Sequence, residues 1–125
     1  MARILIIDDE PLVRFTLRRI LERCGHEITE AETGKLGVEA HRREPADLIL
    51  MDIVMSGMDG YGAIRKFVGE FPDVKIVAMS GGGRTHNRNS LEAAKSVGAL
   101  MTISKPFRSA PLLAIVSELL ANGPN

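Results

Sequence analysis

Two short apolar runs that each end in aspartate restrict the fold of this chain more than any other feature. Residues 4–7 are wholly apolar and stop at Asp8 and Asp9, and residues 48–51 are wholly apolar and stop at Asp52. A run of this length without polar alternation is typical of a strand that is buried on both faces. Such strands occur in parallel sheets covered by helices on both sides, so the pattern predicts an α/β protein.

Helical segments alternate with the strand-like runs along the chain. Strands are predicted over 4–7, 26–31, 47–52, 74–79 and 100–103, and helices over about 11–24, 34–44, 64–71, 91–97 and from 109 onward. Pro11 suits the first turn of a helix, Thr33 suits a helix cap, and Gly25 suits the residue just after a helix. Five strand–helix units in succession predict right-handed crossovers and a parallel sheet with helices on both faces.

Length and composition exclude several classes of protein. A chain of 125 residues fits one domain, spanning 1–125 with an ordered core of about 3–121. Sixteen basic and sixteen acidic residues give no net charge, so direct nucleic-acid binding is not expected. The single cysteine, Cys24, excludes a disulfide framework, and we place it in the core. No apolar run approaches the ~20 residues of a membrane span, so we expect a soluble, cytoplasmic protein without membrane insertion.

Polar residues follow the ends of four of the predicted strands. Asp8 and Asp9 follow the first, Asp52 ends the third, Ser80 follows the fourth and Lys105 follows the fifth. Each alone is an ordinary turn or cap residue, but ligands of open parallel sheets bind beyond the carboxyl ends of the strands. If the first and third strands are neighbours, three carboxylates crowd one cleft, which is costly unless a cation neutralises them. Oxygen ligands of this kind favour Mg²⁺.

Four motifs resemble the receiver domain of two-component response regulators. They are Asp-Asp-Glu-Pro at 8–11, the segment 51–60, Met-Ser-Gly-Gly at 79–82 and the segment 98–107, and the resemblance spans essentially the whole chain. The resemblance implies a flavodoxin-like (βα)5 fold whose five parallel strands lie in the order 2-1-3-4-5, with helices on both faces.

The resemblance also implies a role for each polar residue. Asp52 would accept a phosphoryl group from a phosphohistidine on a sensor histidine kinase or a histidine phosphotransfer protein. Lys105 would pair with the phosphoryl oxygens, and the Ser80 hydroxyl would donate a hydrogen bond to them. The implied ligands of Mg²⁺ are Asp8, Asp9, Asp52 and the backbone carbonyl of Val54. The chemistry agrees, because phosphoryl transfer needs positioning and charge stabilisation, and a carboxylate nucleophile gives an acyl phosphate.

We therefore expect a stand-alone phosphoacceptor domain rather than an enzyme, catalysing only its own phosphorylation and dephosphorylation. It would act by protein–protein contact or as a phosphorelay, on a downstream protein that the sequence does not identify. One alternative is a Mg²⁺-dependent phosphatase using Asp52, although the haloacid-dehalogenase type has an aspartate where Val54 stands. The other is an interaction module that works without phosphorylation, although intact Asp8, Asp9 and Lys105 disfavour it.

Two positions bear on how the signal is received and passed on. Thr102 stands where receivers commonly carry an aromatic residue, so we expect activation to displace the backbone of residues 81–90 instead. The partner surface would then be the face built by the fourth helix, fifth strand and fifth helix. Phe15 lies opposite the apolar stripe of the first helix, where it is expected to be exposed and could receive a partner's helix beside Asp52.

Overall fold

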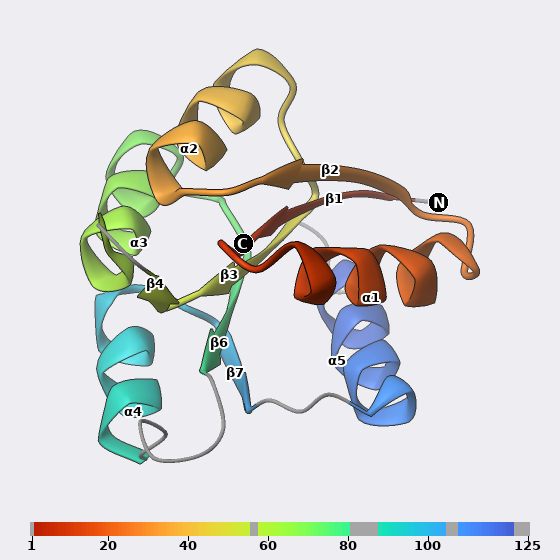
Figure 1. The fold of residues 1–125 in the computed structure, drawn as a ribbon. Coiled ribbons are helices and arrows are strands. Elements are labelled where there is room, and N and C mark those ends of the chain that lie inside the picture. Colours follow the sequence, from red (N-terminus) through yellow and green to blue (C-terminus); the bar gives the residue numbers. More distant parts are fainter. Residues whose placement is uncertain (1, 56–57, 81–87, 105–107, 122–125) are drawn as a thin grey trace.

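Five parallel strands form the central sheet of the computed structural model, which describes residues 2–55, 58–80, 88–104 and 108–121 (Figure 1). They are β1 (Arg3–Ile7), β2 (Glu27–Ala31), β3 (Leu48–Asp52), β6 (Ile76–Ser80) and β7 (Met101–Ser104). Their order across the sheet is β2-β1-β3-β6-β7, and every neighbouring pair is parallel. The predicted order 2-1-3-4-5 is therefore confirmed.

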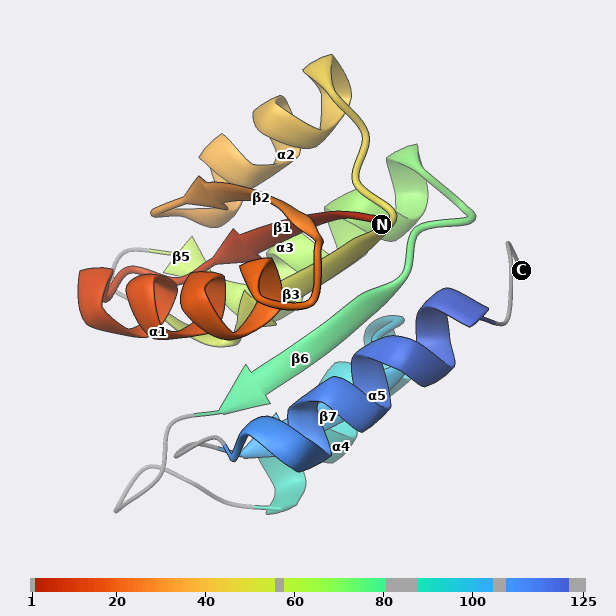
Figure 2. The same ribbon diagram turned by 90° about the vertical axis from the view of Figure 1, so that its right-hand side faces the viewer.

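Helices cover both faces of the sheet, as expected for buried parallel strands. The helices α1 (Pro11–Glu22) and α5 (Ser109–Ala121) pack on one face (Figures 1 and 2). The helices α2 (Gly34–Arg43), α3 (Gly60–Glu70) and α4 (Arg88–Val97) pack on the other. The central strands β3 and β6 are buried at every residue, whereas the edge strands β2 and β7 are only partly covered. The wholly apolar runs of the sequence therefore lie in the interior of the sheet.

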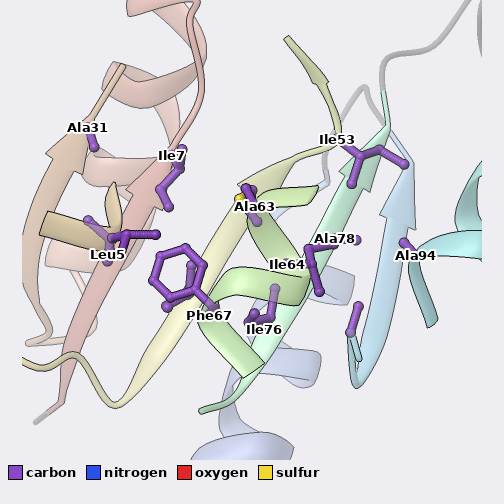
Figure 3. Packing of buried hydrophobic residues seen from close by; sticks show 14 residues of the cluster. Leu5, Ile7, Ala31, Ile53, Ala63, Ile64, Phe67, Ile76, Ala78 and Ala94 are labelled. Carbon is purple, nitrogen blue, oxygen red and sulfur yellow. The ribbon is translucent and has the colours of Figure 1, made fainter. Parts of the chain in front are cut away.

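The sheet separates two apolar clusters because alternate side chains of a strand point to opposite faces. In β1, Leu5 and Ile7 pack with Phe67 of α3, while Ile4 and Ile6 pack toward α1 and α5. Figure 3 shows the first cluster, in which the fully buried Phe67 ring lies beside β1. On the same face α2 approaches β1 closely, since a Cβ at Gly37 would overlap the side chain of Ile7.

The predicted helix starts at 11, 34 and 109 are confirmed, whereas α3 begins four residues earlier than predicted, at Gly60, and the predicted end of α1 is wrong. Pro11 begins α1, and the Thr33 hydroxyl caps α2 by accepting the backbone N–H of Leu36 at 3.1 Å. The helix α1 ends at Glu22, earlier than expected, and Cys24 is exposed rather than buried. The physical reason is that Cys24 already belongs to the turn in which Gly25 adopts a left-handed φ of 87°.

A short antiparallel pair after β3 was not predicted. The strands β4 (Val54–Met55) and β5 (Met58–Asp59) pair with Val54 opposite Asp59, in a segment for which the sequence analysis named no strand. Two-residue strands carry no periodic signal, which explains why the pattern missed them. Within the described ranges, no helix combines the length and the apolar character needed to cross a bilayer.

A buried histidine of α2 packs against the end of α3. The His41 side chain forms T-shaped ring contacts with Phe67 and Phe71, at centroid distances of 5.7 and 4.5 Å. Its Nδ1 accepts the backbone N–H of Ala46 at 3.0 Å, so the neutral ring carries its proton on Nε2. Burial lowers the pKa of His41 from its usual 6.5, and the charge of Glu70 opposes this only in part.

We expect the free energy of unfolding to fall as the pH is lowered below about 6.5. The unfolded chain takes up a proton on His41 near its usual pKa of 6.5, whereas the folded protein resists it until its lower pKa is reached. The stabilisation is therefore present above pH 6.5 and is lost as the pH falls toward the folded value. Urea unfolding at several pH values measures the slope of the free energy of unfolding against pH.

Two variants serve as controls for the group responsible. Burial also lowers the pKa of His26, so His41→Gln and His26→Gln should each remove part of the slope. An unchanged slope in His41→Gln would assign the effect elsewhere.

Candidate phosphoacceptor site

The candidate site lies at the carboxyl edge of the sheet, where β1 and β3 end side by side. Ile7 pairs with Met51 in the parallel register, so the next residues along the two strands, Asp8 and Asp52, are neighbours. Both side chains are buried, with Asp8 at 0% and Asp52 at 2% exposure. The strand order reverses direction at β1 and β3, which is the position where open α/β sheets bind their ligands.

Four carboxylates converge at this edge. Asp8, Asp9, Glu10 and Asp52 each offer a carboxylate oxygen, and these four atoms lie within 4.8 Å of one another. The structure thus brings together the three aspartates that the sequence nominated. It adds Glu10, which the sequence analysis named only as part of the motif at 8–11 and which is exposed. Its place directly after the aspartate pair was the one available signal that Glu10 could join them.

The donor chemistry of this cluster fits a hard divalent cation. Like charges at such short separation raise the free energy of the metal-free protein unless they are neutralised or protonated. All four donors are carboxylate oxygens, the ligand type preferred by Mg²⁺ and Ca²⁺. Asp8 and Asp52 are buried, whereas Asp9 is partly exposed and Glu10 is exposed, so one side of the cluster is open to solvent. The arrangement can hold a cation beside Asp52.

The backbone after β1 turns sharply, and this turn sets the direction of the acidic residues. The N–H of Asp8 donates to the carbonyl oxygen of Ala31 at 3.2 Å, which extends the pairing with β2 by one residue. The N–H of Glu10 donates to Asp8 Oδ1 at 2.9 Å, an aspartate-capped turn that leads into α1. Local hydrogen bonds therefore fix the backbone from which the acidic side chains project.

Ser80 is the last residue of β6 and is fully buried. In the register between β3 and β6, Asp52 pairs with Met79, so Ser80 extends one residue further toward the carboxyl edge. Ser104 pairs with Ser80 at the end of β7, and Lys105 directly follows it in the chain. Asp52 thus belongs to the strand between the one that leads to Asp8 and the one that ends at Ser80.

Other predicted residues are not tested by these contacts. Lys105 and residues 81–87 lie outside the described residues, so the lysine's role and the expected backbone displacement stay predictions. Val54 lies in β4, but the part proposed for its carbonyl oxygen also stays a prediction. Thr102 lies in the edge strand β7 opposite Ala78 and is partly exposed.

The fold and the acidic edge define a class of protein, and comparison with known proteins gives its family. An open parallel sheet with convergent carboxylates after its first and third strands in the chain is the arrangement that the receiver resemblance implied. The family model described as the response regulator receiver domain matches residues 4–117. The chain belongs to this family, and receiver domains are signalling domains of two-component systems.

Individual relatives match over nearly their whole length. Protein PilH of Pseudomonas aeruginosa is 35% identical over 97% of this chain and 99% of its own. The chemotaxis protein CheY of Thermotoga maritima is 32% identical over 94% of this chain and 96% of its own. The crystal structure of the receiver domain of NtrX from Brucella abortus superimposes with a TM-score of 0.89 at 28% identity, covering 96% of this chain and 99% of that domain. Against a longer NtrX chain, the match spans only 27% of that chain.

Proposed function

We propose that this protein is a phosphoacceptor that takes a phosphoryl group onto Asp52 from a phosphohistidine of a sensor kinase or phosphotransfer protein. The observation that carries the proposal is the middle position of Asp52. It ends β3, between the strand leading to Asp8 and the strand ending at Ser80. A nucleophile at this point would have carboxylates on one side and the Ser80 hydroxyl on the other. Phosphoryl transfer needs such positioned groups more than it needs acid–base chemistry.

In the proposed reaction, a carboxylate oxygen of Asp52 attacks phosphorus while the bond from phosphorus to the histidine nitrogen breaks. The electron pair of that bond stays with the imidazole, which takes up a proton, and the product is an acyl phosphate on Asp52. Ser80 would donate its hydroxyl hydrogen to a phosphoryl oxygen, and Lys105 would supply a compact positive charge.

We assign Mg²⁺ to the acidic cluster, held by Asp8, Asp9, Asp52 and the backbone carbonyl of Val54. The cation would orient the phosphoryl oxygens and offset the charge that the phosphoryl group brings to the cluster. The convergence of the carboxylate oxygens within 4.8 Å supports this assignment. Glu10 belongs to the same cluster, but its exposure favours a contribution through charge or through bound water rather than as a fixed ligand.

The experiment that tests the proposal is incubation with acetyl phosphate and Mg²⁺, followed by intact mass measurement. We expect the gain of one phosphate, which disappears when the metal is removed with a chelator. Continuous release of inorganic phosphate from unrelated phosphomonoesters would instead support the phosphatase alternative. No phosphate gain from acetyl phosphate or from phosphorylated kinases would support the phosphorylation-independent interaction module.

An exposed apolar pair on α1 marks where we expect the phosphodonor protein to dock. Leu12 is 73% exposed and Phe15 is 53% exposed, and both lie in the first turns of α1, directly after the acidic residues. The guanidinium of Arg19 lies over the Phe15 ring at 5.6 Å from its centroid, which favours one orientation of the ring. A buried aromatic anchor is the kind of residue that dominates the affinity of a protein interface.

Phe15→Ala should slow phosphotransfer from a phosphorylated kinase about tenfold, since removing an aromatic anchor commonly costs more than 1 kcal/mol of binding free energy. The same variant should accept phosphate from acetyl phosphate at the wild-type rate, because the small donor needs no docking surface. Leu36→Ala is the matched control, as Leu36 is 48% exposed but lies on α2, on the other face of the sheet. Equal slowing with both donors would place Phe15 in the structure of the site rather than in docking.

A further inference from the structure

Arg14 of α1 connects the acidic turn to the neighbouring strand β2. Its Nη1 donates to the backbone carbonyl oxygen of Asp8 at 2.6 Å, and its Nε donates to Glu30 Oε1 at 2.9 Å. Only 13% of the Arg14 side chain is exposed, so both bonds are largely shielded from water. Hydrogen bonds from a charged donor in such surroundings are among the stronger ones in proteins.

The bond to Asp8 acts on the backbone that carries the acidic residues. The carbonyl of Asp8 and the N–H of Asp9 belong to one planar peptide unit, so fixing the carbonyl oxygen also restrains the backbone nitrogen and Cα of Asp9. The N–H of Asp8 is held by Ala31 at 3.2 Å, and the N–H of Glu10 is held by Asp8 Oδ1 at 2.9 Å. Arg14 thus adds a restraint on the Asp8–Asp9 peptide, which neither of these two hydrogen bonds involves.

Glu30 provides a firm anchor for Arg14. Its other carboxylate oxygen accepts a hydrogen bond from Arg18 Nε at 2.5 Å, so two guanidinium groups hold it from both sides. Arg18 lies one helical turn after Arg14 and also pairs with Glu22. Glu30 is therefore fixed against α1. Because Arg14 is bonded to both Glu30 and the carbonyl oxygen of Asp8, it holds the acidic turn at a fixed place relative to Glu30.

We propose that Arg14 is a positioning residue for the acidic cluster. It holds the Asp8–Asp9 peptide in the orientation in which the carboxylates converge, and by this it strengthens Mg²⁺ binding without contacting the ion. The part that concerns Mg²⁺ rests on the proposed function, whereas the restraint of the turn does not.

The sign of a substitution separates positioning from simple electrostatics. A positive guanidinium near a cation site repels the cation, so removing its charge alone should tighten Mg²⁺ binding. If Arg14 positions the ligands, its removal should weaken Mg²⁺ binding, as seen for residues that orient metal ligands from outside. The two explanations therefore predict opposite changes in the dissociation constant.

The experiment compares Arg14→Met with Arg18→Met by titrating Mg²⁺ into each metal-free variant in a calorimeter. Methionine keeps much of the length and the helix propensity of arginine but lacks the charge and the donors. Both variants lose one ion pair with Glu30, and only Arg14→Met also loses the bond to Asp8. We expect the dissociation constant to rise about tenfold in Arg14→Met. In Arg18→Met it should stay within about twofold or fall slightly. Unchanged or tighter binding in Arg14→Met, or equal weakening in both variants, would overturn the proposal.

A second readout needs no metal. In Arg14→Met the backbone amide of Glu10 should exchange its hydrogen faster than in Arg18→Met, because the turn that protects this amide is no longer restrained. If Arg14→Met does not fold, Arg14→Lys takes its place in this experiment. Lysine keeps the charge but lacks the planar pair of donors, so the amide of Glu10 should again exchange faster. Equal exchange in the Arg14 and Arg18 variants would overturn the restraint. Absence of Mg²⁺ binding by the wild-type protein would contradict the proposed function, and the exchange rates would still decide whether Arg14 restrains the turn.

Discussion

Asp52→Asn should gain no phosphate from acetyl phosphate and Mg²⁺ under conditions in which the wild-type protein gains one. The substitution keeps the size and shape of the side chain, but it replaces the attacking carboxylate oxygen with an amide that cannot form a stable acyl phosphate. Intact mass measured over time gives the rate. Asp52 is buried at the end of a central strand, so the variant also relieves carboxylate crowding and should fold at least as well.

Asp47→Asn is the matched control for this substitution, since Asp47 precedes the same strand at its amino end, where its carboxylate accepts the backbone N–H of Arg3 at 2.8 Å. It should be phosphorylated at close to the wild-type rate. Phosphate gain by Asp52→Asn at the wild-type rate would show that another residue is the acceptor.

Asp9→Ala should raise the dissociation constant for Mg²⁺ by about 100-fold or more. Replacing a residue that only supports a metal ligand already lowers metal affinity about 10–100-fold, and Asp9 is proposed as a ligand itself. Phosphorylation by acetyl phosphate at low Mg²⁺ should slow accordingly. The metal-free variant should be at least as stable as the wild type, because one of four crowded carboxylates is gone. Adding Mg²⁺ should then raise the melting temperature of the wild type but hardly that of the variant.

Glu10→Ala separates ligation from charge, because it removes one carboxylate from the same cluster at an exposed position. Its effect on Mg²⁺ affinity should be clearly smaller than that of Asp9→Ala. Equal effects would mean that the total charge of the cluster, and not Asp9 as a ligand, governs binding.

The fold could be predicted because the sequences of its central strands are almost wholly apolar. The runs that form β1, β3 and β6 are buried along essentially their whole length. Short apolar runs of this kind are typical of parallel strands that are covered on both faces. Thr33 and Pro11 marked helix starts through chemistry that acts within a few residues. Signals of this local kind can be read from a single sequence.

The errors arose at a helix end, in very short strands and at contacts between distant parts of the chain. Cys24 has the correct helical spacing for the core, but the turn centred on Gly25 ends α1 before it. The β4–β5 pair consists of two-residue strands and has no period to detect. Nothing in the spacing of Arg14 and Glu30 indicated their contact, since they meet only when β2 lies beside β1.

The candidate site could also be predicted only in part. The aspartates at the ends of β1 and β3 could be named because parallel strands bring their carboxyl ends to one edge. The convergence of Glu10 with them, and the support from Arg14, depend on the hydrogen bonds of the turn after β1. Strand order thus determines which residues meet, and the local turn determines how closely.

The central claim is tested most directly by locating the phosphate. Reduction of the phosphorylated protein with borohydride converts a phosphorylated aspartate to homoserine, and trypsin then separates the candidates. Asp8 and Asp9 fall in the peptide 4–14, and Asp52 falls in the peptide 44–65 together with Asp47 and Asp59. Fragmentation of the second peptide should place the modification on Asp52, and the peptide 4–14 should remain unchanged. Homoserine at Asp8 or Asp9, or at another aspartate of the second peptide, would contradict the account.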